Sequence, residues 1–437
     1  MSLYKLQGQN IFTLKSDEKA FVEIPFKKIN NLIIINVEIN DIPLNLIFDT
    51  GVKQTILLNF KEADSLNLKK LKTRIFVGAG NKKKNITAVK SIDNRIKIGK
   101  KIISTNADVF LIKNEDFKFS ENLGVPIFGF IGGDLIDDFL VEINYHKNIL
   151  RFYSINSENI RKFRSYKKID IDIIEDKPFV EAKIFFDKTH TKQVKLLLDT
   201  GNSDALWLFN SKHLKVPAYL KRIPDYFGLG FNGEIQGERF KLKQLKLPGN
   251  IKLKDIYTAL PDSIYYKDLI RNNPFDGIIG GEILRRFKIV LDYRHKKLFL
   301  KRKFWSYFAE FPFNDSGLQL IYAGKVPVKI AKTVSKFDKV DYDKQNQIII
   351  LTKTELIYEY KLIDKIIVEY VRPESPAYKA GFVKGDVILK INGHNVYNYN
   401  LNQLENKFLY KTGKNLRFLI KRNGLIMELK LENTSPF

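Results

Sequence analysis

Two Asp-Thr-Gly triplets are the residues in this chain whose types and spacing could do chemistry. The first ends the run Leu46-Ile47-Phe48-Asp49-Thr50-Gly51, and the second ends the run Leu196-Leu197-Leu198-Asp199-Thr200-Gly201. An apolar run that ends in Asp-Thr-Gly predicts a buried strand that delivers a carboxylate to a tight turn. Two such turns can bring two carboxylates face to face, where like charges cannot both ionise and the pair comes to share one proton.

An internal repeat surrounds the triplets, whose aspartates are 199 − 49 = 150 residues apart. The stretch Gly129-Phe130-Ile131-Gly132-Gly133-Asp134-Leu135 recurs as Gly277-Ile278-Ile279-Gly280-Gly281-Glu282-Ile283. Tyr145 and Tyr293 follow these stretches at an offset of 293 − 145 = 148. A long repeat in near register predicts two copies of one structural unit.

Each copy must position its triplet with strands. Runs rich in apolar residues predict strands over 32–39 and 41–48 in the first copy, and over 179–186 and 193–198 in the second. Each Gly-Gly pair predicts the start of a short helix, over 134–139 and 282–287. A strand hairpin follows each helix, with its turn at His146-Lys147-Asn148 or at His295-Lys296-Lys297. We therefore expect two small β-rich lobes that face each other about a pseudo-two-fold axis.

On these residues the chain resembles the retropepsin-type aspartic proteases, in a single-chain form with two fused lobes. The resemblance rests on each Asp-Thr-Gly and on the later apolar pair with glycine, Ile131-Gly132 and Ile279-Gly280. It covers about residues 20–303 and implies lobes over 20–157 and 165–303. In this family the apolar pair and its glycine pack behind the catalytic turn. The resemblance implies aspartic endopeptidase activity with Asp49 and Asp199 as the catalytic dyad.

The residues beside the aspartates suit supporting roles. The hydroxyls of Thr50 and Thr200 could hydrogen-bond across to the opposite loop, and Gly51 and Gly201 allow close backbone approach to the carboxylates. One carboxylate would act as base on a water molecule while the other, protonated, donates to the scissile carbonyl. This chemistry needs no metal and no organic cofactor. Because both halves lie in one chain, a monomer should be sufficient to form the site.

The chain departs from the family pattern directly after each triplet. Val52 and Asn202 stand where the family commonly has Ala or Ser. A missing serine hydroxyl removes one hydrogen bond to a carboxylate and alters the titration of the dyad.

Two glycine-rich segments are candidates for flaps that bend over an extended substrate. Gly78, Ala79 and Gly80 are the candidates in the first lobe, and Gly228 and Gly230 are those in the second. Ordinary hairpin turns explain the same glycines equally well. A protein or peptide substrate would bind as an added strand between flap and dyad.

The C-terminal part resembles a PDZ domain. The resemblance is carried by the stretch from Ser375-Pro376-Ala377 to Asn392-Gly393, and it implies a domain over about 314–434. The family binds an extended C-terminal peptide beside a helix. Gly317, Leu318, Gln319 and Leu320 are the candidate peptide-binding loop, and a run over 401–409 is the candidate groove helix.

This domain departs from its family in the long segment between Leu320 and Ile366. Runs over 347–352 and 356–360 predict extra strands that could reshape the groove. Peptide capture and a purely structural clamp on the protease lobes therefore both stay open.

Composition narrows the other function classes. Lys+Arg exceeds Asp+Glu by 74 − 49 = 25, but the lysines are spread along the chain and no nucleic-acid-binding motif accompanies them, so we expect no nucleic-acid partner. Cysteine is absent, and the five histidines show no metal-binding spacing. No run of 18 apolar residues predicts a membrane span.

Cellular location is left open by the sequence. The first residues contain no apolar signal core, which fits either a cytoplasmic protein or one whose export signal is trimmed. Fused lobes with a PDZ domain suggest a bacterial protein, and similar proteins are commonly exported. The leading hypothesis is an endopeptidase with a PDZ module. A catalytically inactive peptide-binding scaffold is the alternative, and a nucleic-acid binder is supported only by net charge.

Overall fold

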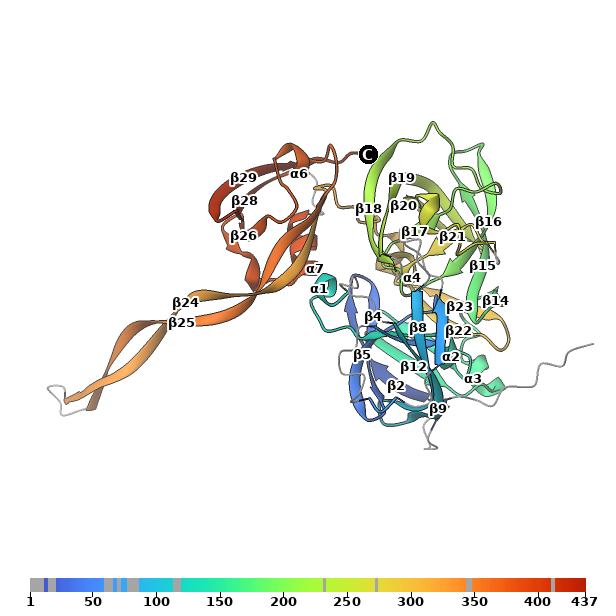
Figure 1. The fold of residues 1–437 in the computed structure, drawn as a ribbon, viewed down its shortest axis with the longest axis horizontal. Coiled ribbons are helices and arrows are strands. Elements are labelled where there is room, and N and C mark those ends of the chain that lie inside the picture. The colour runs from blue at the N-terminus through green and yellow to red at the C-terminus, as the bar shows by residue number, and fades with distance from the viewer. Residues whose placement is uncertain are drawn as a thin grey trace, which may run out of the picture. The chain divides into compact units, whose positions relative to one another are not determined.

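The computed structural model describes residues 12–14, 21–58, 66–68, 72–76, 86–112, 119–230, 233–271, 274–342, 348–409 and 413–437. Figure 1 shows the fold, which is mainly β, as the sequence predicted. The chain divides into two compact units. The first comprises residues 1–315 with 435–437, and the second comprises 316–434.

The first lobe is built on a sheet that has nine strands among the described residues. They are β1 (Thr13–Leu14), β3 (Lys27–Ile29), β4 (Leu32–Ile39), β5 (Ile42–Phe48), β6 (Thr55–Leu58), β7 (Lys72–Phe76), β8 (Ile86–Ile98), β9 (Ile102–Ile112) and β10 (Gly129–Ile131). Their order is β1-β9-β6-β10-β5-β4-β8-β7, with β3 beside β4. The short helices are α1 (Phe119–Leu123) and α2 (Gly133–Ile136).

The second lobe repeats this plan in a sheet with eight described strands. They are β14 (Asp172–Ile174), β15 (Lys177–Phe185), β16 (Thr191–Leu198), β17 (Leu206–Leu208), β18 (Arg222–Gly230), β19 (Gly233–Leu247), β20 (Ile251–Pro261) and β21 (Gly277–Ile279). Their order is β14-β15-β16-β21-β17-β20-β19-β18. The helical turns are η1 (Ser263–Tyr265) and α4 (Gly281–Leu284).

The two lobes share one unusual strand arrangement. In the first lobe β10 lies between β5, to which it is parallel, and β6, to which it is antiparallel. In the second lobe β21 lies in the same way between β16 and β17. The register pairs Ile131 with Phe48 and Ile279 with Leu198. Each apolar pair of the repeat therefore lies beside the residue that precedes a triplet aspartate.

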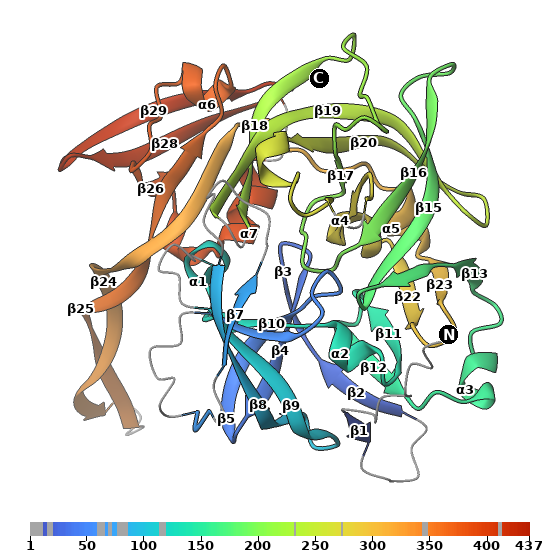
Figure 2. The same ribbon diagram turned by 45° about the vertical axis from the view of Figure 1, so that its right-hand side comes forward.

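A third sheet, with six described strands, joins the lobes. Its strands are β2 (Phe21–Pro25), β11 (Leu140–Asn144), β12 (Ile149–Tyr153), β13 (Lys167–Asp170), β22 (Phe287–Asp292) and β23 (Lys297–Arg302). At its centre β11 of the first repeat pairs antiparallel with β22 of the second. Figure 2 shows these strands between the lobes. Along the chain, helix α3 (Ser157–Arg161) lies between β12 and β13, and helix α5 (Phe304–Phe308) follows β23.

The helices after Gly-Gly differ from their predicted extent. We predicted helices over 134–139 and 282–287, whereas α2 ends at Ile136 and α4 ends at Leu284. Each helix makes a single turn because the chain must then enter β11 or β22 within a few residues. The hairpin turns after β11 and β22 lie at the predicted positions.

One apolar core runs through both lobes. Phe48 and Leu198, which precede the aspartates, belong to it together with the fully buried Ile131 and Ile279. Burying one such side chain stabilises the folded state by about 1.5–3 kcal/mol. The core therefore fixes the positions of the strands that lead to the triplets.

The second unit is a sheet with six described strands and short helices. They are β24 (Leu318–Tyr342), β25 (Ile348–Val371), β26 (Val387–Ile391), β27 (His394–Asn395), β28 (Lys414–Arg422), β29 (Leu425–Asn433), α6 (Pro376–Lys379), η2 (Val396–Asn398), α7 (Leu401–Leu404) and η3 (Glu405–Leu409). The strand order is β24-β25-β26-β28-β29, with β27 beside β26. Leu318, Val368, Phe418 and neighbours form its separate core.

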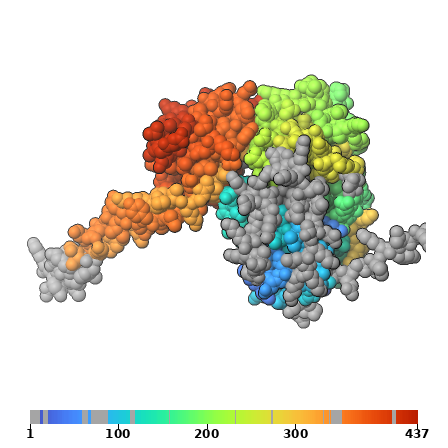
Figure 3. Space-filling view, in the orientation of Figure 1, coloured from blue at the N-terminus to red at the C-terminus, as the bar shows by residue number. Residues whose placement is uncertain are grey.

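The long segment that we predicted to hold extra strands is a single two-stranded ribbon. β24 and β25 stay paired from Leu318–Val371 to Tyr342–Ile348, so the predicted strand over 356–360 is the middle of β25. Figure 3 shows the ribbon (orange) as a narrow projection from the body of this unit. Its residues Leu356, Tyr358, Tyr360 and Leu362 are exposed at alternate positions.

Candidate active site

Asp49 and Asp199 each follow the last residue of a central strand, β5 or β16. The backbone N–H of Asp49 donates to the carbonyl of Ile131 over 2.8 Å, and that of Asp199 donates to the carbonyl of Ile279 over 2.9 Å. Asp49 is 5% exposed, and Asp199 is partly exposed. The apolar pairs of the repeat thus hold the aspartates in matching positions.

The glycines of the triplets bring the two carboxyl groups close together. The N–H of Gly51 donates to Oδ1 of Asp49 over 2.7 Å, and the N–H of Gly201 donates to Oδ1 of Asp199 over 2.8 Å. A Cβ on Gly51 would lie 2.9 Å from Cγ of Asp199, and one on Gly201 would clash with Cγ of Asp49. Glycine is required at both positions because each faces the opposite aspartate.

The threonines of the triplets tie the two turns together. The hydroxyl of Thr50 donates to the carbonyl of Leu198 over 2.6 Å, and that of Thr200 donates to the carbonyl of Phe48 over 2.8 Å. Each hydroxyl also accepts the backbone N–H of the other threonine over 3.0 Å. Both threonines are buried, so these four bonds form a water-free link across the pseudo-two-fold axis.

The environment favours one shared proton. Burial raises the pKa of Asp49 well above its usual range, and the charge of Asp199 and a hydrogen bond between the two side chains raise it further. Burial also raises the pKa of Asp199, while that same hydrogen bond and the N–H groups of Gly201 and Asn202 oppose the rise. Because both pKa values are raised and the two carboxyl groups are hydrogen-bonded to each other, the pair holds one proton between them above the usual titration range of carboxyl groups.

Two hairpin turns brace the aspartate loops from the opposite lobe. Asn31 of the first lobe donates from Nδ2 to the carbonyl of Ser203 over 3.0 Å and to Oε2 of Glu282 over 3.1 Å. Asp176 of the second lobe pairs with Nζ of Lys53 over 2.7 Å. Each loop that follows a triplet is thus fastened to the other lobe.

Sequence reasoning missed these bracing residues. Their signal is a pair of two-residue turns at 30–31 and 175–176, where both residues have a positive φ. Asn-Asn is typical of such a hairpin turn, and the two turns recur at an offset of 175 − 30 = 145, close to that of the triplets. The turn was visible in the sequence, but its contact with the other lobe was not.

The residues directly after the triplets have different surroundings. Val52 is buried in an apolar cluster of the first lobe with Ile56 and Phe130. Asn202 accepts the N–H of Asp204 at Oδ1 over 2.9 Å, while its own N–H donates to the carboxylate of Asp199. The Asn202 side chain therefore bonds within its own loop, and the group that it presents to Asp199 is its backbone N–H.

The flap predictions have unequal outcomes. Gly78, Ala79 and Gly80 lie outside the described residues. Gly228 and Gly230 lie in β18, which pairs with β19 as a hairpin. The register shifts between Tyr226 and Gly228, and Gly228 has a φ of 103°, which suits glycine. The second lobe thus has a bent glycine-bearing hairpin, and its role as a flap stays a prediction.

The predicted PDZ loop precedes and begins β24. Gly317 has a φ of 76°, Leu318 and Leu320 are buried in the core, and Gln319 is partly exposed. Two residues after this loop, Tyr322 accepts the N–H of Leu401 at its hydroxyl over 3.1 Å, so its ring reaches from β24 to the start of α7. Among the described strands β24 pairs with β25 alone.

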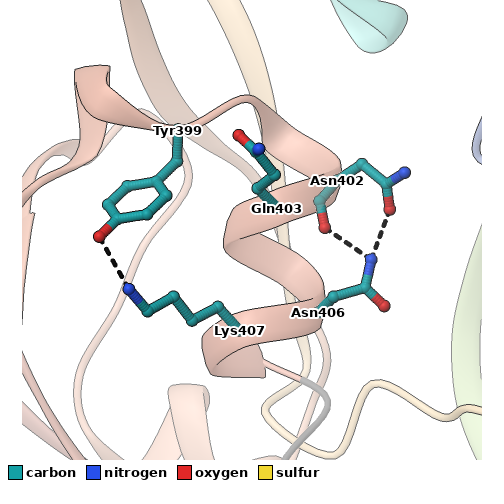
Figure 4. Close-up of a pocket in the computed structure, with 5 residues that line it drawn as sticks. All are labelled: Tyr399, Asn402, Gln403, Asn406 and Lys407. Carbon is teal, nitrogen blue, oxygen red and sulfur yellow. Dashed lines mark hydrogen bonds between the residues drawn. The ribbon is translucent and has the colours of Figure 1, made fainter.

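A polar hollow lies along α7 and η3. Figure 4 shows its lining, in which Nζ of Lys407 donates to the hydroxyl of Tyr399 over 2.8 Å and Nδ2 of Asn406 donates to the carbonyl of Asn402 over 2.7 Å. Two of the lining side chains, Lys407 and Asn406, therefore donate to neighbours within the hollow.

The described residues contain neither a metal-binding cluster nor a helical membrane span. Within those residues no cluster of three or more His, Asp or Glu side chains could hold a metal ion. No helix in the same part of the chain is long and apolar enough to cross a membrane.

Comparison with known proteins gave four findings. A solved aspartic proteinase from Irpex lacteus aligns with a TM-score of 0.41 at 13% identity, covering 66% of this chain and 98% of its own. Basic 7S globulin from soybean aligns with a TM-score of 0.40 at 9% identity, covering 64% and 94%. No curated protein matches the sequence. The family profile of the PDZ domain matches residues 367–422, so the predicted C-terminal PDZ domain is confirmed over that range.

Proposed function

We propose that the first unit is an aspartic endopeptidase whose dyad is Asp49 and Asp199. The observation that carries the proposal is the pair of carboxyl groups that face each other and share a hydrogen bond, with glycines alone clearing the space between them. A buried carboxyl pair with one proton is a matched acid and base, which peptide hydrolysis requires.

The reaction would proceed in two proton-coupled steps. The carboxylate of Asp199 removes a proton from a water molecule, whose oxygen attacks the scissile carbonyl carbon while Asp49 donates its proton to the carbonyl oxygen. The diol then collapses: Asp199 gives the proton that it took from water to the amide nitrogen, Asp49 takes one hydroxyl proton of the diol, and the carbon–nitrogen bond breaks. The products are a carboxylic acid and an amine, and the dyad again holds one proton. The link between Thr50 and Thr200 would keep the geometry constant through both steps.

The second unit supplies a peptide-binding module in this proposal. A PDZ domain adds an extended peptide to a strand edge, and the described part of β24 has one edge without a partner strand. Because Tyr322 spans from β24 to α7, we expect a short ligand whose end lies near Gly317 and Leu318.

Cleavage of a mixed peptide library between pH 3 and 8 tests the proposal. We expect wild type to cleave and Asp49→Asn and Asp199→Asn to lose activity by about 10²–10⁴-fold or more. Asp41→Asn is the matched control, since Asp41 is an exposed aspartate of the first lobe in a surface ion pair with Arg95. Cleavage by either dyad variant at the wild-type rate would refute the assignment.

The pH profile carries further information. Because the pKa values of both aspartates are raised, the one-proton state should persist above the ordinary titration range of carboxyl groups. Activity should fall on the acid side as Asp199 gains a proton and on the alkaline side as Asp49 loses its own. Both aspartates lie in one chain, so we also expect activity per molecule to be unchanged by dilution.

A binding scaffold without catalysis is the second candidate. The PDZ domain over residues 367–422 favours it, since such domains bind extended peptides at a strand edge. Measurable peptide affinity of wild type with no turnover at any pH between 3 and 8 would favour the scaffold over the enzyme.

A further inference from the structure

A buried ionic cluster lies in the second lobe beside the aspartate loop. Arg239 on β19 is 8% exposed and donates from Nε to Oδ2 of Asp225 on β18 over 2.6 Å. Its two terminal nitrogens donate to the two carboxylate oxygens of Asp204, each over 3.2 Å. The guanidinium thus forks onto Asp204 and holds Asp225 with its remaining nitrogen.

Aromatic side chains cover the cluster. Nε1 of Trp207 donates to Oδ2 of Asp204 over 2.8 Å. The ring of Phe227 lies 5.0 Å from the Arg239 guanidinium and 5.7 Å from the Trp207 ring. Burial lowers the pKa of Arg239, but Asp204 and Asp225 outweigh it and raise that pKa, so the cation persists at every working pH. The pair of Arg239 with Asp225 is buried and little weakened by salt, whereas the Asp204 side chain is 25% exposed.

The cluster connects the bent hairpin to the second aspartate. Asp225 precedes the register shift between Tyr226 and Gly228, Phe227 lies within that shift, and Arg239 lies on the returning strand. Asp204 lies in the loop after the triplet, where its N–H is held by Asn202, whose own N–H donates to the carboxylate of Asp199. A chain of direct contacts thus runs from the base of the hairpin to Asp199.

The first lobe shows that a lobe of this fold does not need these charges. The offset of the triplets, 199 − 49 = 150, matches Asp204 with Gln54. Strand register matches Arg239 with Val89. In the second lobe Arg239 pairs with Ala259, which also pairs with Trp207. In the first lobe Val89 pairs with Leu111, which also pairs with Leu57.

Asp225 has an apolar counterpart by the same register. Asp225 pairs with Gly237, which is two residues before Arg239. Ile75 pairs with Thr87, which is two residues before Val89, so Ile75 corresponds to Asp225. The first lobe therefore has Gln54, Ile75 and Val89 at the positions of the cluster. A buried ion cluster often contributes no more stability than apolar residues of similar size.

We propose that Asp204, Asp225 and Arg239 form an ionic clamp that positions the β18–β19 hairpin against the loop of Asp199, and that Arg239 is a positioning residue for cleavage. The clamp fixes the hairpin just before Gly228, where the strand bends, so that Leu229 and Gly230 take one place relative to the dyad. This inference rests on the proposed endopeptidase activity. Its structural half, the anchoring of the hairpin, does not.

The triple variant Asp204→Gln/Asp225→Ile/Arg239→Val gives the second lobe the residues of the first and leaves no buried charge behind. The matched control is Arg222→Gln/Glu238→Gln, which removes an ion pair of 3.0 Å from the same two strands without touching the aspartate loop. Both full-length variants would be compared with wild type by peptide cleavage between pH 3 and 8 and by amide hydrogen exchange of β18.

We expect the triple variant to stay folded and to lose kcat/KM by about tenfold to a hundredfold, as small displacements at an active site do. Amide exchange over 226–230 should accelerate in the triple variant and not in the control. The acid limb of the pH profile of the triple variant should shift to higher pH, because a loosened backbone N–H of Asn202 no longer lowers the pKa of Asp199. A merely structural role would not move that limb.

If the triple variant folds and has the same cleavage kinetics and the same amide hydrogen exchange as wild type, the inference is overturned. If wild type itself does not cleave, the proposed function fails, and hydrogen exchange alone then decides the anchoring. If the triple variant does not fold, Arg239→Lys replaces it, since lysine keeps the charge but cannot fork onto both aspartates. We then expect an intermediate loss of activity, and unchanged activity in Arg239→Lys would also overturn the inference.

Discussion

The two lobes of the first unit deliver matching aspartates from matching strands, yet they surround them differently. In the first lobe the loop after the triplet packs Val52 into an apolar cluster, and α2 carries the carboxyl of Asp134. In the second lobe the same places hold Asn202 and Glu282, and buried arginines compensate the acids. The threonines that meet at the axis make matching contacts, whereas the residues around the triplets differ between the lobes. Among these side chains, symmetry is thus confined to the triplets.

Glu282→Gln should have the largest effect on stability. Glu282 is buried and bonds Arg285 over 2.6 Å and Arg286 over 3.0 Å, and Arg286 is 1% exposed. A neutral side chain leaves a buried cation without its charge partner, which typically costs about 3–5 kcal/mol. Urea unfolding followed by tryptophan fluorescence measures it, because both tryptophans, Trp207 and Trp305, lie in the first unit.

The control for this change is Glu38→Gln, which breaks the part-exposed pair with Lys97 in the first lobe. We expect it to change stability by less than about 1 kcal/mol. A loss as small as this in Glu282→Gln would mean that the second lobe does not depend on its buried charges.

Thr50→Val and Thr200→Val should follow, with equal effects. Each change removes a hydroxyl that donates to a buried carbonyl and accepts a buried N–H of the other lobe. Every buried group left unpaired costs about 1–3 kcal/mol, so we expect a loss of about 2–4 kcal/mol in each variant. Thr258→Val, whose hydroxyl bonds the carbonyl of Ile256 in its own strand, is the control with the smaller expected loss. Clearly unequal losses of stability would show that Thr50 and Thr200 are not equivalent at the axis.

Asp134→Asn should act in the opposite direction to Glu282→Gln, although the two residues occupy equivalent places, 282 − 134 = 148 apart. Burial, followed by the charge of Asp176, raises the pKa of Asp134 to about 7. The folded state therefore keeps a proton that the unfolded chain has lost above about pH 4. Stability contributed by that proton declines as the pH rises from about 4 to about 7.

At pH 8 the asparagine variant should accordingly be more stable than wild type, by about 1–2 kcal/mol. The difference should shrink as the pH falls to 4. Melting temperatures at pH 4, 6 and 8 measure it, and a variant less stable than wild type at pH 8 would contradict the cause given for the raised pKa.

Lys53→Met should have the smallest effect. The ion pair of Lys53 with Asp176 crosses between the lobes, but the lysine side chain is 45% exposed. Exposed pairs contribute about 0–1 kcal/mol, and salt screens them. Thermal unfolding at low salt and at 1 M salt should show at most a small loss that disappears in high salt. A loss that persists in high salt would assign the turn at 175–176 a larger part in joining the lobes.

The sequence predicted what depends on neighbouring residues. An apolar run before Asp-Thr-Gly identifies a strand and its turn, because alternation and turn chemistry act over a few residues. The mainly β class and the PDZ domain were predicted in the same way. The single-turn helices α2 and α4 were predicted too long, because only the third sheet decides where the next strand begins.

Contacts between distant residues were beyond that reasoning. Asn31 meets Glu282 across 251 residues of chain, and Arg239 meets Asp204 across 35. Neither pair shares a motif, and arginine in a strand reads as a solvent-facing residue until its neighbours are known.

By itself the sequence determined that two carboxylates sit at the ends of two buried strands, because that follows from local chemistry repeated twice. Only the tertiary structure decided that the pKa values of Asp49, Asp199 and Asp134 are raised, and that Arg239 contacts both Asp204 and Asp225. Burial and the distance between charges set these properties, and both arise when distant segments pack together.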